Sequence, residues 1–305
     1  MSERGWVYSN GEIVPFEEAR YWPHDLAIIF GDMVFEATRT FNSRPFRLDA
    51  HLDRLYRSLR YARIDPGMTQ ESMRQASLDV LERNLPDVPS GSDVWIFHNV
   101  SRGIHPQFRV PERDHAGATV LIWTHELGFR FWADGYANGV SCVTTSVQQM
   151  PPGTLDPRMK TRSRMYLALA EQEVHAIDPQ SHALMLDANG HIAEAVGANF
   201  MLVHDRTILT PRSGTGLAGV SLVTVRELAG GLDMEVREAN LTLYDVYNAE
   251  EAMLSSTPYS LLPVTRVNGT PIGAGAPGPA YGRLLAAWSD LVGVDIAAQA
   301  ARFDK

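Results

Sequence analysis

Three residues of this sequence carry side chains that could perform chemistry together. Lys160 lies in the segment LDPRMKTRSRMYLALAEQEV, Glu194 in LDANGHIAEAVGANF and Thr257 in AEEAMLSSTPYSLLPVTRVNG. A lysine amine can form a Schiff base with a carbonyl carbon, a carboxylate can keep a ring nitrogen protonated, and a hydroxyl can bind a phosphate. Because most lysines and glutamates are solvated surface groups, the hypothesis depends on the three occurring together.

The surroundings of Lys160 and Glu194 are compatible with these roles. Arg162 and Arg164 follow Lys160 closely, and neighbouring cations favour the neutral amine that a Schiff base requires. Glu194 follows a predicted turn and shares one face of a predicted strand with Ile192. The pattern alone leaves both residues open to a second interpretation, in which each is a solvated charge.

A phosphate site is predicted where a glycine-rich loop leads into a helix. The segment GTGLAGVSLVTVRELA places Gly219, Val220 and Ser221 at the start of that helix. A helix N-terminus offers unpaired N–H groups and a favourable dipole to an anion. Arg54, by contrast, lies off the apolar stripe of its own predicted helix, so the pattern by itself indicates a solvated arginine.

The composition is that of an ordinary globular protein. The 305 residues exceed what one core usually holds, so two domains are expected. The formal charge of −9 disfavours nucleic acid or an anionic membrane surface as the main partner. Cys142 is the single cysteine, and we find neither a signal peptide nor a long apolar span, so a cytoplasmic protein without a metal site is expected.

The order of predicted elements favours an α+β fold in two domains. Strands cluster, and helices occur between them without regular alternation. We expect domains over 1–127 and 139–305, joined by an aromatic loop over 128–138. Helices are predicted over 49–63, 69–84, 162–176 and 219–229 and after Pro279, and strands within 6–16, 94–101, 118–125, 140–147, 183–187, 191–195, 199–205, 207–211, 234–243 and 252–256.

Six segments, in order, resemble the fold-type-IV (class IV) aminotransferases. This family includes branched-chain aminotransferases, D-amino-acid aminotransferases, (R)-amine transaminases and aminodeoxychorismate lyases. The segments are the Asn-Gly hairpin with FGDMVFEATRTF, PFRLDAHLDRLYRSL, the Lys160 segment, AEAVGANF, LAGVS, and STPYSLLPV with VNGTPI. The resemblance covers nearly the whole chain. It implies a small N-terminal domain, a larger C-terminal domain, and pyridoxal 5'-phosphate (PLP) between them in a homodimer, with the active site near the interface.

The resemblance also implies a role for each candidate residue. Lys160 would form the Schiff base and move protons, and Glu194 would hold the pyridine nitrogen. The cofactor phosphate would be bound by Arg54, Val220, Ser221 and Thr257. The implied reaction is a ping-pong transamination between an amino acid or primary amine and an α-keto acid.

Several departures from the family pattern bear on the substrate. Pro258 has no N–H where branched-chain enzymes receive the substrate carboxylate, and Phe97 stands where they carry an arginine. Arg39 and Arg109 could bind the carboxylate instead, and Phe30 replaces a family tyrosine. These substitutions favour a D-amino acid or an (R)-amine as donor.

Three other activities stay open. The first is an aminodeoxychorismate-lyase-type enzyme, which would turn over without a keto-acid acceptor. The second is a branched-chain L-amino-acid aminotransferase. The third is a non-catalytic PLP-binding protein on the same scaffold.

Overall fold

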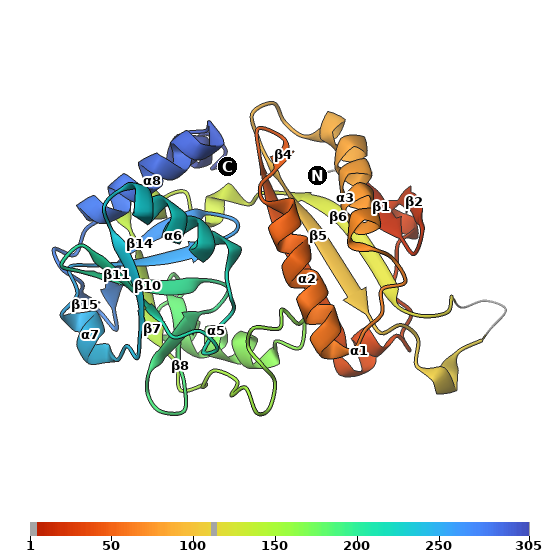
Figure 1. Cartoon of the computed structure of the whole chain (residues 1–305), viewed down its shortest axis with the longest axis horizontal. Coiled ribbons are helices and arrows are strands. Elements are labelled where there is room, and N and C mark those ends of the chain that lie inside the picture. Colours follow the sequence, from red (N-terminus) through yellow and green to blue (C-terminus); the bar gives the residue numbers. More distant parts are fainter. Residues whose placement is uncertain (1–4, 111–114, 305) are drawn as a thin grey trace. The chain divides into compact units, whose positions relative to one another are not determined.

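The structure, a computed structural model, describes residues 5–110 and 115–304 and divides the chain into two units (Figure 1). Unit 1 comprises Met1–Leu127 and Met159–Arg164. Unit 2 comprises Gly128–Arg158 and Met165–Lys305. Each contains its own sheet with helices packed on it, as expected for an α+β chain.

The units differ from the expected boundaries in two places. Residues 128–138, expected as a separate loop, belong to unit 2 and contain a 3-10 turn, η4 (Phe129–Phe131), and a short helix, α4 (Gly135–Asn138). Residues 159–164, expected in the C-terminal domain, belong to unit 1 because their backbone pairs with a strand of its sheet.

Unit 1 is built on a six-stranded sheet in which every pairing between neighbouring strands is antiparallel. The strand order is β2-β1-β6-β5-β3-β4. The strands are β1 (Trp6–Ser9), β2 (Glu12–Pro15), β3 (Met33–Phe41), β4 (Arg44–Pro45), β5 (Val94–Ser101) and β6 (Thr119–Glu126). The helical segments are η1 (Phe16–Glu18), α1 (Leu26–Phe30), α2 (Leu48–Ala62), α3 (Gln70–Asn84), η2 (Leu85–Asp87) and η3 (Pro106–Phe108).

Helices α2 and α3 cover one face of this sheet (Figure 1). Leucines of α2 recur three or four residues apart, so they form one apolar stripe. The stripe packs against residues of β3, β5 and β6 that alternate along each strand, including Val34, Ile96 and Ile122. The side chains between them, such as Phe35 and Phe97, therefore point to the opposite face of the sheet.

Unit 2 is built on a nine-stranded mixed sheet. Its order is β12-β11-β10-β13-β14-β7-β8-β9, with β15 paired to β14, and β11–β12, β14–β7 and β7–β8 are parallel pairs. The strands are β7 (Val140–Thr144), β8 (His182–Leu186), β9 (Ile192–Ala195), β10 (Asn199–His204), β11 (Thr207–Pro211), β12 (Glu235–Ala239), β13 (Glu251–Ser256), β14 (Ser260–Val267) and β15 (Thr270–Pro271). The remaining helices are α5 (Met165–Ile177), α6 (Val220–Gly231), α7 (Leu243–Tyr247), α8 (Pro279–Val292) and α9 (Ile296–Arg302).

A helix is predicted over 162–176, but in the structure α5 begins three residues later, at Met165. The residues before it are extended: Thr161 forms a β-bridge with Val34, and the N–H of Arg162 donates to the carbonyl of Met33. Because these backbone groups are already paired with β3, the helix cannot include them.

Candidate active site

Lys160 is held by hydrogen bonds to two elements of unit 1. It is the only lysine in the described part of the chain. Its N–H donates to Oγ of Ser58 on α2 at 3.2 Å, and its carbonyl accepts from the N–H of Phe35 on β3 at 2.9 Å. Its amine lies 4.6 Å from the centroid of the Phe35 ring. The backbone of Lys160 is thus fixed by α2 and β3, and its amine lies against Phe35.

Two arginines share the Phe35 ring with Lys160. The guanidinium carbon of Arg162 lies 3.8 Å from the ring centroid and that of Arg164 lies 5.4 Å away. Burial, together with the charge of Arg164, lowers the pKa of Arg162 to about 10. The cationic setting that the sequence predicts around Lys160 is therefore present.

Arg54 is buried, in contrast to the solvated arginine that the helix pattern indicates. Its Nε and Nη2 donate to the two carboxylate oxygens of Glu36 at 2.8 and 2.7 Å. His51 places Nδ1 3.1 Å from the same carboxylate. Burial would raise the pKa of Glu36, but Arg54 and His51 hold it well below its usual range. Glu36 therefore occupies one edge of the guanidinium and fixes its orientation.

Glu194 is held by two donors within unit 2. Gln149 Nε2 donates to its Oε1 at 2.5 Å, and the N–H of Leu217 donates to its Oε2 at 2.9 Å. Gly216 lies so close that an added Cβ would be 2.9 Å from Oε2. The carboxylate is thus fixed by the glycine-rich loop. Sequence reasoning missed the role of Gln149, for which we find no sequence signal.

The N-terminus of α6 fits the requirements of a phosphate site. Its N-cap is Gly219, which provides no side-chain cap, and the buried Val220 and Ser221 begin the helix. The unpaired N–H groups of such a first turn attract an anion. A side chain at Gly219 would collide with the amide oxygen of Asn199, so glycine is required there.

Thr257 lies in the turn between β13 and β14. Ser255, just before it, is paired with Asn199 of β10, the residue that contacts the N-cap of α6. The Ser255 hydroxyl is buried and has no hydrogen-bond partner among the described residues. The turn that contains Thr257 and the start of α6 therefore both lie beside the paired strands β10 and β13.

The three predicted substrate residues do not form one cluster. Arg39 is only 2 % exposed, donates from Nε to the carbonyl of Thr40 and stacks on Phe41. Arg39 pairs with Trp95 and lies four residues, roughly 13 Å, along β3 from Phe35, whose N–H donates to the carbonyl of Lys160. Phe30 and Arg109 are exposed, at the end of α1 and just after η3. Arg39 therefore lies at the far end of the strand from Lys160.

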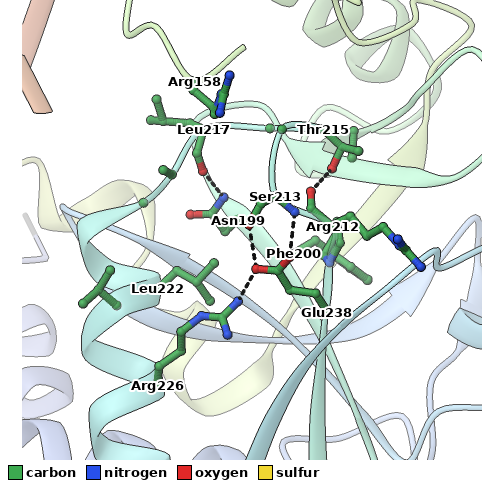
Figure 2. Close-up of a pocket in the computed structure, with 17 residues that line it drawn as sticks. Arg158, Asn199, Phe200, Arg212, Ser213, Thr215, Leu217, Leu222, Arg226 and Glu238 are labelled. Carbon is green, nitrogen blue, oxygen red and sulfur yellow. Dashed lines mark hydrogen bonds and ion pairs between the residues drawn. The ribbon is translucent and has the colours of Figure 1, made fainter. Parts of the chain in front are cut away.

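Unit 2 also contains a cavity of about 350 Å³ beside the glycine-rich loop. Figure 2 shows Glu238 in this cavity accepting hydrogen bonds from Arg226 and from the N–H of Ser213. Asn199 joins this cavity to the loop by donating to the carbonyl of Leu217 at 2.8 Å. Gly216 and Leu217, which contact Glu194, also line the cavity. Glu194, Ser221 and Thr257 do not line it.

Neither a metal site nor a single membrane-spanning helix is found in the described residues. They contain no group of three His, Cys, Asp or Glu residues that could hold a metal ion. No single helix among them has the length and apolar character to span a membrane, although α8 and α9, bent by 82°, pass that test as a pair.

Comparison with known proteins points to one group of enzymes. The chain is 26% identical over 293 residues to a branched-chain-amino-acid aminotransferase of Escherichia coli K12, covering 94% of this chain and 92% of the relative. It resembles the T.th. branched-chain amino acid aminotransferase complexed with N-(5'-phosphopyridoxyl)-L-glutamate, with TM-score 0.84, 27% identity and 95% of each chain covered. The complex of that enzyme with 4-methylvaleric acid gives TM-score 0.83 and 25% identity, covering 99% of this chain and 97% of the other.

These relatives do not support the expected preference for a D-amino acid or an (R)-amine, and they favour the branched-chain alternative. The expectation relied on Arg39, which is buried at the far end of β3, and on Arg109, which is exposed on a loop. The family model described as amino-transferase class IV matches residues 33–267, which contain all the segments described above except those at the two ends. The chain belongs to the class IV aminotransferases.

Proposed function

We propose that this protein is a PLP-dependent transaminase that exchanges the amino group of an amino acid with an α-keto acid by a ping-pong mechanism. The observation that carries the proposal is Lys160, the only described lysine, held beside Phe35 and two arginines. Solved relatives with pyridoxamine 5'-phosphate or a phosphopyridoxyl adduct support the choice of cofactor.

PLP, when bound, supplies a ring that accepts electrons from the substrate carbon losing a proton. Lys160 would hold the cofactor as a Schiff base and carry that proton. Glu194, fixed by Gln149 and Leu217, would keep the ring nitrogen protonated. Both residues would therefore act on charge that develops during the reaction.

The phosphate would be bound by Arg54, Val220, Ser221 and Thr257. Arg54 would contribute its buried guanidinium, whose orientation Glu36 fixes through two hydrogen bonds. Val220, Ser221 and Thr257 would contribute backbone and hydroxyl donors from unit 2.

We propose a branched-chain aliphatic L-amino acid as the donor. The relatives are named for this substrate class. The sheet face that bears Phe35 also carries a stacked row of Trp95, Phe97 and Trp123, with neighbouring ring centroids 5.1 Å apart. Such a row can contact an apolar side chain.

We further propose that the protein is a homodimer of the cytoplasm. Ile28 and Phe30, two residues apart on α1, are 59 and 69 % exposed, and Phe108 of unit 1 is 49 % exposed; exposed apolar side chains that gather on a surface mark protein–protein interaction sites. Cys142, the single cysteine of the sequence, is buried, so the fold does not depend on an oxidising compartment.

Reduction with borohydride after incubation with PLP tests the assignment of Lys160. The sequence contains two lysines, so Lys160→Ala leaves only Lys305, and Lys305→Ala is the matched control. We expect a covalent cofactor adduct in the wild type and the control, and none in Lys160→Ala. An adduct that persists in Lys160→Ala would place the Schiff base elsewhere.

Steady-state rates test the substrate class. We expect L-leucine with 2-oxoglutarate to react faster than D-alanine or (R)-1-phenylethylamine with the same acceptor, and no turnover without a keto acid. Turnover without an acceptor would instead indicate the lyase-type enzyme.

A further inference from the structure

Arg162 and Arg164 form a positive cluster without a counter-charge. Neither makes an ion pair with an acidic residue in the described part of the chain, although both lie against Phe35. Their charges repel, and the charge of Arg164 adds to burial in lowering the pKa of Arg162. Two half-buried like charges reduce the stability of the fold. An anionic ligand would provide the missing compensation.

Arg162 is also held in a defined orientation. Its Nε donates to Oδ1 of Asn99 at 3.1 Å, and Asn99 in turn hydrogen-bonds the hydroxyl of Tyr21. Its guanidinium lies over Phe35, and its backbone N–H donates to Met33. The two terminal nitrogens of the guanidinium have no hydrogen-bond partner among the described residues. Such a preoriented fork matches the two oxygens of a carboxylate.

The position of Arg162 relative to Lys160 suggests which carboxylate it binds. The β-bridge of Thr161 with Val34 makes this segment extended, so Lys160 and Arg162 project to the same side, with their Cα atoms roughly 7 Å apart. In a transaminase the lysine acts on the carbon that bears the amino group, and an α-carboxylate is attached to that carbon.

We propose that Arg162 binds the carboxylate of the substrate, with Arg164 adding positive charge. The inference rests on the proposed function, because it requires a substrate that reacts at Lys160. It replaces Arg39 and Arg109, which lie at the far end of β3 and on an exposed loop.

Binding of unreactive carboxylates to the PLP-loaded enzyme tests this assignment. We compare the wild type with Arg162→Leu, Arg162→Lys and Arg164→Leu, using 4-methylvalerate and glutarate as probes in a calorimetric titration. Arg60→Leu is the matched control, because Arg60 is exposed on α2 and its removal changes the net charge equally. Losing a charge-assisted hydrogen bond should weaken 4-methylvalerate binding about ten- to a hundredfold in Arg162→Leu.

We expect a smaller loss in Arg162→Lys, which keeps the charge without the fork, and in Arg164→Leu. The kcat/KM of L-leucine should fall by a similar factor, whereas that of 3-methylbutylamine, the same molecule without its carboxylate, should not change. A loss confined to glutarate would overturn the proposal for the α-carboxylate and assign Arg162 to the second carboxylate of a dicarboxylic substrate.

The outcomes separate this inference from the proposed function. Failure of the wild type to form the borohydride-trapped adduct at Lys160 would overturn both. An adduct that forms in every variant, with a Kd for both carboxylates equal to that of Arg60→Leu, would overturn the role of Arg162 alone.

Discussion

Single residues in this chain have roles that depend on partners distant in sequence. Arg54 lies off the leucine stripe of α2, so its own helix predicts a solvated side chain. It is buried because Glu36 of β3, 18 residues earlier in the sequence, supplies a carboxylate for its guanidinium. A helical pattern contains no information about the charge of the opposing strand. The resemblance to a family, rather than periodicity, indicated that Arg54 matters.

The pair of Glu36 and Arg54 makes a prediction about pH. The pKa of Glu36 is lowered in the folded chain, so its contribution to stability is present above its unfolded pKa, about 4.3, and is lost as the pH falls toward the folded value. Glu36→Gln leaves Arg54 buried without its counter-charge. We expect it to reduce the free energy of unfolding at pH 7 by about 3–5 kcal/mol, and by progressively less below pH ~4.

Urea denaturation of the two proteins over a series of pH values measures this difference. Asp49→Asn is the control. Asp49 lies on α2, the helix of Arg54, and it is exposed and forms an ion pair with Arg74. Its removal should cost at most about 1 kcal/mol. Equal costs for the two variants, or a cost of Glu36→Gln that does not depend on pH, would contradict the assignment.

At the level of elements, the sequence predicted the helices better than the central strands. The stripe of α2 and the Thr69 cap of α3 are visible in the sequence, and the predicted helices end within two residues of α2 and α3. β3 was not predicted, because all nine of its residues are buried and no apolar–polar alternation remains. β14 was missed as well, and it contains Pro263, which normally argues against a central strand.

The contacts that hold Glu194 show a further limit of sequence reasoning. The glycine-rich loop was predicted to serve the phosphate through the start of α6. The structure adds a second task, since Leu217 and Gly216 of the same loop contact Glu194. Loop glycines are ambiguous in a sequence because they permit either an unusual backbone conformation or a close approach.

We therefore predict that Gly216→Ala displaces Glu194. The added Cβ would be 2.9 Å from the carboxylate oxygen, closer than such atoms approach, so the side chain or the loop must shift. We expect kcat for transamination to fall at least tenfold, equivalent to about 1.4 kcal/mol in the barrier, while PLP remains bound through Lys160. Gly230→Ala, in α6 with open space around it, is the matched control and should retain wild-type kcat. Equal rates in the two variants would show that the contact is not needed.

At the scale of the whole molecule, the chain exposes apolar side chains that a single copy leaves uncovered. Ile28 and Phe30 are exposed on α1, which is short and capped by Asp25 through the N–H of Ala27. The helix is thus built by polar contacts at its start, and its exposed apolar residues do not contribute to the core of unit 1. A second copy of the chain is the partner that the class IV resemblance implies.

The last prediction concerns this surface. Ile28→Asp combined with Phe30→Asp places two charges where a dimer would bury apolar area, so we expect sedimentation equilibrium to show a monomer at micromolar concentration, whereas the wild type is a dimer. Tyr244→Asp, at an exposed aromatic residue of unit 2, is the control and should stay dimeric. Circular dichroism of the double variant must match the wild type, because Ile28 and Phe30 are exposed and their replacement should not unfold unit 1. A wild-type monomer, or a double variant that remains a dimer, would rule out α1 as part of a dimer interface.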